Sequence, residues 1–265
     1  MPQILSPADY AYVQEATVAA GKKLLQTSNA VLHTKRHALD LVTQADLDSE
    51  AFLRERLTKR FPTIGFYSEE TAKESEKELE KELVWVVDPL DGTLQFSRNL
   101  PFFGVSVGLM RQGKPVAGFI YLPRFDELYH AQKGSGAYIG KKQIHVAQRE
   151  YPTKSVGVLS YTGLNVDQQG KLHDIFIQDN VIVLRIGSAI FQLAHIAAGH
   201  YDFYVCLNNA LWDLAAGWAI VEEAGGTVEV WIDMKKKAAG NFYHVSFIAG
   251  NKKVVNYFGS KLKAL

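Results

Sequence analysis

The 265-residue sequence has a single cysteine, Cys206, and almost no excess of charge, with 29 basic and 28 acidic residues. One cysteine cannot form a disulfide within the chain, so the fold suits a reducing compartment and the cytoplasm is the default prediction. A formal net charge of +1 gives no field that would draw the protein to nucleic acid or to an anionic membrane. Both classes of partner are therefore disfavoured.

Long apolar runs are also missing. The first residues mix acidic side chains with short apolar pieces, without the basic region and apolar run of a secretory signal, and no later segment approaches a membrane-spanning length. We therefore expect neither export nor membrane insertion. The 47% hydrophobic and 22% charged content is typical of a globular protein with a large core.

Hydrophobic periodicity predicts one α+β unit over residues 1–265, with approximate halves at 1–150 and 151–265. In the first half we expect an antiparallel sheet with helices. The pattern predicts helices at 6–25 and 45–60 and a solvated helical segment within 69–82. It also predicts a buried strand at 83–87 that ends at Asp88, a hairpin over 103–121, and strands at 128–131 and 137–139. In the second half strands near 155–160, 181–185, 227–230 and 245–249 alternate with helices near 167–178, 188–198 and 212–225.

Two acidic residues, Asp88 and Asp91, lie three positions apart where the buried strand is expected to end. Carboxylate oxygens are ligands that magnesium prefers, and Gly92 permits close approach of the backbone. If a helix begins at Thr93, the free N–H groups of its first turn would make a phosphate site. Taken alone, the segment is equally compatible with a helix cap followed by a turn.

Other segments accompany this one in a defined order. The succession of Ser68-Glu69-Glu70, Asp88-Pro89-Leu90-Asp91-Gly92-Thr93 and Trp212-Asp213-Leu214-Ala215-Ala216-Gly217 resembles the inositol monophosphatase family. Lys35 and the segment from Asp40 to Asp46 are similar to that family's amino-terminal loop, and Gly187-Ser188-Ala189 is similar to its sugar-side loop. The resemblance covers about residues 30–250.

The resemblance implies a layered α/β/α/β/α sandwich, metal-dependent hydrolysis of small phosphate monoesters, and commonly a homodimer. It implies two to three Mg²⁺ ions in each active site and inhibition by lithium. Carried over by position, Glu69, Asp88 and the Leu90 carbonyl would hold the first ion, Asp88, Asp91 and Asp213 the second, and Glu69 with Asp46 the third.

The chemistry that the resemblance implies is attack by a metal-activated water, with a second ion stabilising the leaving oxygen. Glu69 is expected to be the partner of that water, and Thr93, hydrogen-bonded to Asp46, to orient it. No covalent intermediate is required. The substrate-binding set implied in the same way is Asp91, Gly92, Thr93, Gly187, Ser188, Ala189 and Asp213.

Substrate recognition departs from the family pattern. Cys206 lies seven residues before Asp213, where inositol-specific members often carry a glutamate that binds sugar hydroxyls, and Gln95 replaces a more usual asparagine. The leading expectation is inositol monophosphate or a related polyol or sugar phosphate. Fructose 1,6-bisphosphate and nucleotides such as NADP or 3'-phosphoadenosine phosphates stay open as alternatives. A regulatory or RNA-associated role is less favoured, because Asp88, Asp91 and Asp213 are intact.

Several other residues have a more ordinary interpretation. Glu70 is expected to be a solvated neighbour of Glu69, and Trp212 to pack rather than bind. His37 is a weak candidate for substrate contact, and the eight histidines show no metal-ligand spacing. Lys35 is a similarly weak candidate, because a lysine is most often surface charge. The run 235–237 of three lysines is expected to decorate a surface turn.

Overall fold

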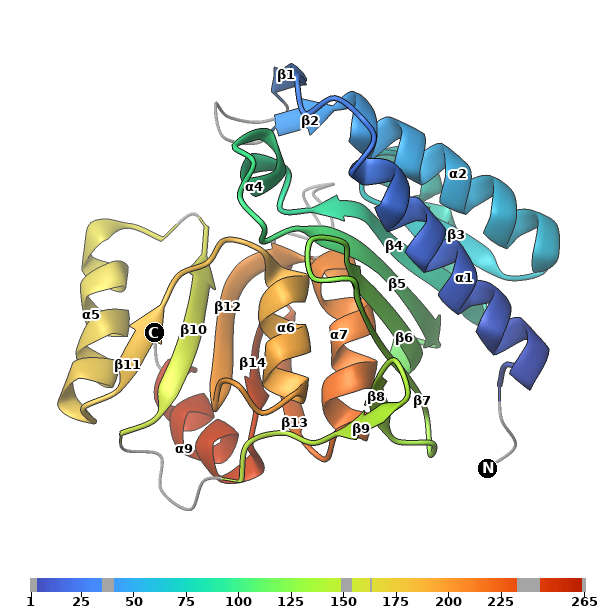
Figure 1. Ribbon diagram of the computed structural model, residues 1–265. Helices are drawn as coiled ribbons and strands as arrows, with labels where there is room; N and C mark the ends of the chain where they lie inside the picture. Colours follow the sequence, from blue (N-terminus) through green and yellow to red (C-terminus); the bar gives the residue numbers. More distant parts are fainter. Residues whose placement is uncertain (1–3, 35–40, 149–153, 163, 233–243, 264–265) are drawn as a thin grey trace.

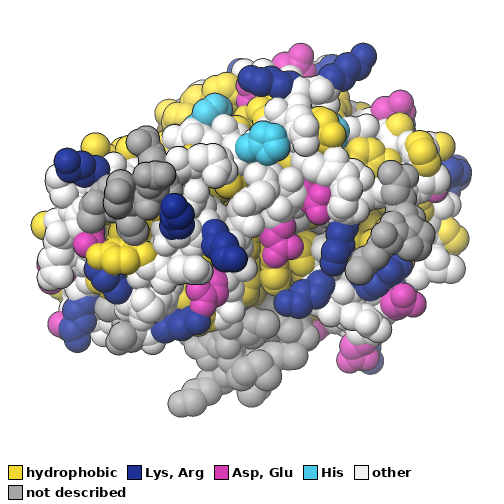
Figure 2. All heavy atoms as spheres, turned by 90° about the horizontal axis from the view of Figure 1, so that it is seen from below, with side chains coloured by type: hydrophobic (Ala, Val, Ile, Leu, Met, Phe, Trp, Pro, Cys, Tyr) yellow, Lys and Arg dark blue, Asp and Glu magenta, His cyan; other side chains and the backbone are white. Residues whose placement is uncertain are grey.

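Two large β-sheets alternate with three layers of helices in the computed structural model, which describes residues 4–34, 41–148, 154–162, 164–232 and 244–263 (Figure 1). The predicted layered α/β/α/β/α sandwich is therefore confirmed. Within the described residues, no helix combines the length and apolar character needed to cross a membrane. On the face drawn in Figure 2, basic and acidic side chains are interspersed.

The first sheet has seven strands in the order β3-β4-β5-β6-β7-β8-β9. Only β3 and β4 pair in parallel, and the other neighbours are antiparallel, as expected for this half. The strand bounds are β3 Gly65–Ser68, β4 Leu83–Asp91, β5 Gly104–Arg111, β6 Lys114–Leu122, β7 Glu127–Gln132, β8 Ala137–Ile139 and β9 Lys142–Ile144.

The second sheet has five strands in the order β11-β10-β12-β14-β13. Strands β11, β10 and β12 are mutually parallel, whereas β14 is antiparallel to both of its neighbours. Their bounds are β10 Val156–Tyr161, β11 Ile182–Leu184, β12 Phe203–Ala210, β13 Thr227–Ile232 and β14 His244–Gly250.

Helices fill the three remaining layers (Figure 1). One pair covers the outer face of the seven-stranded sheet, a second pair lies between the sheets, and a third covers the five-stranded sheet. These pairs are α1 Pro7–Leu24 with α2 Gln44–Arg60, α6 Ala189–Ala197 with α7 Leu211–Glu223, and α5 Val166–Gln178 with α9 Lys252–Leu262.

Strand β4 divides its side chains between two cores, because successive residues of a strand point to opposite faces. Trp85 and Val87 pack under α1 and α2, whereas Val84 and Val86 pack in the core that contains α6 and α7. A continuous apolar run is thus what a strand covered on both sides requires. By the same alternation Asp88 faces the middle helical layer.

Some elements differ from the sequence prediction. Strand β4 does not end at Asp88 but continues to Asp91. The predicted helical segment within 69–82 is two short pieces, α3 Ala72–Ser75 and the 3₁₀ helix η1 Glu76–Glu80. Periodicity also missed the small pair β1 Val31–Thr34 and β2 Leu41–Thr43, strand β9, and helix α9.

Helix α7 packs unusually close to the seven-stranded sheet. Gly108 on β5 and Gly118 on β6 lie opposite each other, directly beneath Ala215 and Ala216. A Cβ built on Gly118 would lie 2.1 Å from the Ala216 carbonyl oxygen, so any side chain there would displace the helix. Because α7 carries Asp213 in its first turn, this contact helps to set where that carboxylate lies.

We expect Gly118→Ala to lower the free energy of unfolding by about 1–3 kcal/mol, since overpacking forces backbone shifts of this cost. Urea denaturation followed by circular dichroism measures the change. Gly170→Ala in α5 is the matched control, because no atom lies within 4 Å of the added methyl group, and alanine there should be neutral or stabilising by up to about 1 kcal/mol. Equal destabilisation by both substitutions would contradict the proposed close packing.

Candidate active site

A β-bulge turns Asp88 and Asp91 to the same side of the sheet. Residues three apart in a regular strand point to opposite faces, but β4 takes three steps between Asp88 and Asp91 while β5 takes two, from Ser106 to Gly104. Leu90 consequently packs in the core beneath α1 and α2. The bulge, rather than the predicted end of the strand, brings the two carboxylates together, and it accommodates Pro89.

Helix α2 supports the bulge from outside the sheet. The Ser49 hydroxyl donates a hydrogen bond of 2.8 Å to the Pro89 carbonyl oxygen, which the bulge removes from the ladder. The Leu90 amide donates to Asp88 Oδ1 at 3.0 Å. These two bonds satisfy backbone groups that would otherwise be orphaned in a buried position.

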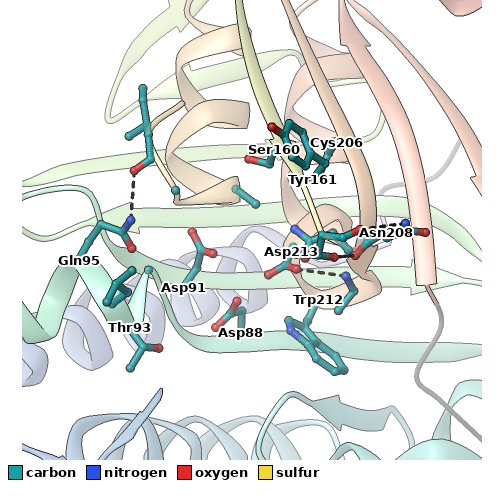
Figure 3. Close-up of a pocket in the computed structure, with 18 of the residues that line it drawn as sticks. Asp88, Asp91, Thr93, Gln95, Ser160, Tyr161, Cys206, Asn208, Trp212 and Asp213 are labelled. Carbon is teal, nitrogen blue, oxygen red and sulfur yellow. Dashed lines mark hydrogen bonds between the residues drawn. The ribbon is translucent and has the colours of Figure 1, made fainter. Parts of the chain in front are cut away.

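Three carboxylates, from Asp88, Asp91 and Asp213, converge at this point, with one oxygen of each within 4.8 Å of the others (Figure 3). The first two come from β4 and the third from the first turn of α7, where the Ala210 amide donates to Asp213 Oδ2 at 3.2 Å. All three side chains are buried. The sequence predicted this grouping, and the structure brings its members together.

Burial and mutual repulsion dominate the electrostatics of the cluster. Burial, together with the surrounding negative charges, raises the pKa of Asp88 and of Asp213 well above the usual range. Burial also raises the pKa of Asp91 to about 6, against the effect of hydrogen bonds from the Ser188 hydroxyl and the Ile190 amide. The protein alone therefore disfavours full ionisation of these acids.

The donor set suits a hard cation. Among the described residues, Asp88 Oδ2 has no hydrogen-bond partner although it is buried, and such a group is costly unless something else binds it. Carboxylate oxygens gathered from two elements are the ligands that Mg²⁺ prefers. The residues present thus fit a divalent metal ion.

Thr93 joins the cluster to helix α2. Its hydroxyl lies 3.0 Å from Asp46 Oδ1 and 3.1 Å from the Leu90 carbonyl oxygen. The other oxygen of Asp46 accepts hydrogen bonds from the Thr43 amide at 2.7 Å and hydroxyl at 2.6 Å. Burial nevertheless raises the pKa of Asp46 to about 6. The predicted pairing of Thr93 with Asp46 is therefore present.

The loop that carries Gly187 and Ser188 closes over the other side of Asp91. Ser188 donates its hydroxyl proton to Asp91 Oδ2. The Gln95 carboxamide donates to the Ile186 carbonyl at 3.1 Å (Figure 3). Gly187 has φ +86°, and a Cβ there would lie 2.2 Å from Gln95 Nε2. Gln95, noted in the sequence as a departure, thus connects helix α4, Thr93–Ser97, to this loop.

A pocket of about 810 Å³ opens above the carboxylates. Of the predicted site residues, Asp46 and Ser188 do not line it but hydrogen-bond to Thr93 and Asp91, respectively. The others line it: Glu69, Asp88, Leu90, Asp91, Gly92, Thr93, Gly187, Ala189 and Asp213. Glu70 does not line it, whereas Trp212 lines it and also packs on Tyr67 with ring centroids 5.7 Å apart. Lys35, His37, Asp40 and the run 235–237 lie outside the described residues.

Glu50 is a supporting residue that sequence reasoning missed. Its buried carboxylate accepts hydrogen bonds from the Glu70 amide at 3.0 Å and the Thr71 hydroxyl at 2.7 Å, and it pairs with Arg54 at 3.0 Å. Glu50 therefore holds the segment that follows β3, on which Glu69 reaches the pocket. Its place four residues after Asp46, on the same face of α2, was the available signal.

Cys206 lies in the wall of the pocket, within β12, and has no exposed surface. Burial raises the pKa of its thiol to about 12, so the side chain is protonated at neutral pH. It supplies no negative charge to the substrate side of the pocket. The departure noted in the sequence is therefore a loss of charge and not a gain of a reactive thiol.

A layered sandwich with three buried carboxylates beneath an open pocket describes an enzyme whose site could hold a metal ion. The chain belongs to the inositol monophosphatase family, whose model matches residues 5–256, and it is a phosphatase.

Individual relatives agree with this assignment. The chain is 36% identical to an inositol-1-monophosphatase of Rhizobium meliloti, over 80% of this chain and 81% of that protein. It is 32% identical to a fructose-1,6-bisphosphatase/inositol-1-monophosphatase of Thermotoga maritima, over 80% and 78%.

Solved structures agree as well. The extragenic suppressor protein suhB of Bartonella henselae superposes with a TM-score of 0.81 at 31% identity, covering 97% of this chain and 98% of that one. A 2'AMP-bound inositol monophosphatase II of Staphylococcus aureus superposes with a TM-score of 0.76 at 27% identity, covering 96% and 93%.

We expect Asp88→Asn to stabilise the metal-free protein by about 1–3 kcal/mol at pH 7.5, because it removes a buried carboxyl that at this pH must either be protonated or carry its charge beside two other acids. A carboxyl with a raised folded-state pKa loses stability as pH rises from its unfolded value towards the folded one. For Asp46 and Asp91 that window runs from about 4 to 6, and it extends higher for Asp88 and Asp213. The stabilisation by Asp88→Asn should therefore be smaller at pH 5 than at pH 7.5.

Urea denaturation of both proteins in chelator measures this difference, and excess magnesium should reverse the order. Burial lowers the pKa of His130 and His195, which makes the stability of both proteins rise with pH in a similar range. The difference between variant and parent removes this shared effect. A variant that is less stable than the parent in chelator at both pH values would show that repulsion among the carboxylates does not control the stability of the metal-free protein.

We expect Glu50→Gln to weaken magnesium binding by about 10-fold, the lower end of effects seen when partners of metal ligands are changed. The readout is the magnesium concentration that gives half-maximal phosphate release, compared with the melting temperature. Glu55→Gln, on the exposed side of α2, is the matched control. Loss of melting temperature without a change in magnesium dependence would indicate a purely structural role.

Proposed function

We propose that the protein hydrolyses a small phosphate monoester with the help of magnesium ions bound at the Asp88, Asp91 and Asp213 cluster. The observation that carries the proposal is the buried, unpartnered Asp88 Oδ2 within three converging carboxylates at the base of a pocket. Glu69 and Leu90 line the same pocket, and the Glu69 carboxylate and the Leu90 carbonyl would complete an all-oxygen donor set. When bound, the ions would supply a water of lowered pKa and positive charge for the leaving oxygen.

Thr93 and Asp46 orient the attacking water in this proposal. The Thr93 hydroxyl has one proton, and its two acceptors are Asp46 and the Leu90 carbonyl. If the Leu90 carbonyl oxygen bound a metal ion, the Thr93 hydroxyl would donate its proton in a hydrogen bond to Asp46 instead. The Thr93 oxygen then accepts a hydrogen bond from the water, whose second proton is held by Glu69.

The phosphate is positioned by the backbone and by the Gly187 loop. Gly92 adopts φ +83°, and a Cβ there would lie 2.6 Å from the Phe102 carbonyl, so a glycine is required for this approach. The amides of Gly92 and Thr93 are proposed to bind phosphate oxygens, and Gly187 and Ala189 to bound the leaving group, while Ser188, predicted with them, holds Asp91. Asp91 and Asp213 face the same space and complete the substrate-binding set.

Inositol monophosphate or a related polyol phosphate is the first candidate substrate, supported by the names of the relatives. A sugar bisphosphate or a nucleotide phosphate is the second, favoured by the uncharged Cys206 wall and by the fructose-1,6-bisphosphatase and 2'AMP-bound relatives. The homodimer, the lithium inhibition, the cytoplasmic location and the number of ions stay predictions.

Release of inorganic phosphate tests the proposal. We expect turnover with magnesium and none with chelator on at least one of inositol 1-phosphate, fructose 1,6-bisphosphate, adenosine 2'-phosphate and NADP. Asp88→Asn should lower kcat/KM by more than about 100-fold, because the charge that holds the ion is lost. Asp167→Asn, in an exposed ion pair on α5, should change it by less than about twofold. Phosphate release that is insensitive to chelator would refute the metal-dependent mechanism.

A further inference from the structure

Charge is distributed unevenly along the walls of the pocket. Four carboxylates, those of Glu69, Asp88, Asp91 and Asp213, belong to the candidate metal centre. Among the described residues that line the pocket, Arg185 is the single cation. Tyr161, against which Arg185 packs, lies on the side of the five-stranded sheet, away from Asp88 and Asp91 (Figure 3).

The fold places Arg185 where ligands of open parallel sheets commonly bind. Strands β10, β11 and β12 are parallel, so their carboxyl ends meet at one edge, and Tyr161 ends β10 while Arg185 follows β11 directly. The crevice outside the carboxyl ends of parallel strands is the usual ligand position in such sheets. Arg185 is therefore at the rim of the pocket because of the topology.

The guanidinium is held in a defined orientation. It stacks over the Tyr161 ring at 4.3 Å from the ring centroid, and Nη1 donates to the Tyr161 hydroxyl oxygen at 3.1 Å. The Tyr161 hydroxyl in turn donates to Gln169 Oε1 at 3.2 Å. A stacked guanidinium loses less freedom when it binds a ligand, because its geometry is already fixed.

The positive charge of Arg185 is not neutralised by any carboxylate among the described residues. Across the described part of the chain, no carboxylate lies within ion-pair distance of it, and its one hydrogen bond is to Tyr161. A guanidinium carries five N–H donors, so most of them are available to a ligand. Phosphate oxygens match this planar fork in charge and in geometry.

The neighbouring wall is uncharged apart from Arg185 among the described residues that line it. Leu159, Leu207 and the protonated Cys206 lie on it beside the polar side chains of Ser160, Thr162, Asn208 and Asn209. Thr162 and Asn208 hydrogen-bond to each other, through the Thr162 hydroxyl at 2.6 Å and the Asn208 carboxamide at 3.0 Å. A ring of hydroxyl groups would find no carboxylate acceptor on this side of the pocket among the described residues.

We infer that Arg185, oriented by Tyr161, forms a subsite for a second anionic group of the substrate. The inference rests on the proposed function, since the first phosphate must lie at the carboxylate cluster. Arg185 is three residues from Ser188, which holds Asp91, and three extended residues span at most about 11 Å. A pocket of 810 Å³, within the usual range of about 300–1,000 Å³, accommodates a sugar bisphosphate or a nucleoside bisphosphate.

Matched substrates test the subsite through kcat/KM for phosphate release with magnesium. Fructose 1-phosphate is compared with fructose 1,6-bisphosphate, and adenosine 2'-phosphate with adenosine 2',5'-bisphosphate. Arg185→Met should lower kcat/KM for the bisphosphate of at least one pair by about 10- to 100-fold, the effect of losing a charge-assisted hydrogen bond. The monophosphates should change by less than about threefold. Arg111→Met, an exposed arginine at the far end of β5, is the control and should change neither.

The pattern of responses identifies the source of the second phosphate. A loss confined to the fructose pair assigns a sugar bisphosphate, and a loss confined to the adenosine pair assigns a nucleotide. An equal loss for both members of each pair would overturn the inference, as would a parent enzyme with no preference for either bisphosphate. If Arg185 recognised only the adenine ring, Arg185→Met would lower kcat/KM equally for adenosine 2'-phosphate and adenosine 2',5'-bisphosphate. That result would also overturn the inference.

Direct binding separates failure of the subsite from failure of the proposed function. Calorimetric titration is performed with calcium in place of magnesium, after phosphate release is found to be below detection. Tighter binding of a bisphosphate than of its monophosphate, lost in Arg185→Met, would support the subsite even if no substrate is hydrolysed. Absence of that difference would overturn the subsite even if hydrolysis with magnesium is observed.

Discussion

Repulsion among three buried carboxylates is the constraint on which the active site depends. Asp88, Asp91 and Asp213 are held within 4.8 Å of one another in a buried position, where like charges without a counter-ion are strongly disfavoured. The surrounding fold must resist this repulsion. It does so with a bulge in β4 supported by Ser49, and with a helix that approaches the sheet over glycines.

The two sides of the pocket are built by different sheets. The seven-stranded sheet and the first turn of α7 supply the three carboxylates, and helices α4 and α2 supply the Thr93–Asp46 pair. The five-stranded sheet supplies the wall that contains Tyr161, Arg185 and Cys206. The carboxylates and this wall therefore come from different sheets, and they are linked through the loop in which Ser188 holds Asp91.

Local patterns predicted most of the elements. Helix α1 begins at a serine cap followed by proline, and the Ser6 hydroxyl accepts the Asp9 amide at 3.2 Å. Helix α9 was missed although Val254, Val255, Phe258 and Leu262 recur on its buried face. The end of β4 was misplaced, because Asp88-Pro89 normally terminates a strand and only the pairing with β5 carries it onward as a bulge.

The sequence by itself determined the chemistry that is available: the acidic residues, their order along the chain, and the family to which they belong. Only the tertiary structure decided that Asp91 shares a face with Asp88, that Glu50 supports the segment after Glu69, and that Arg185 stacks on Tyr161 at the rim of the pocket. The physical reason is range. Helix caps and hydrophobic periods act over a few residues, whereas strand register and contacts between sheets depend on segments that are distant in the chain.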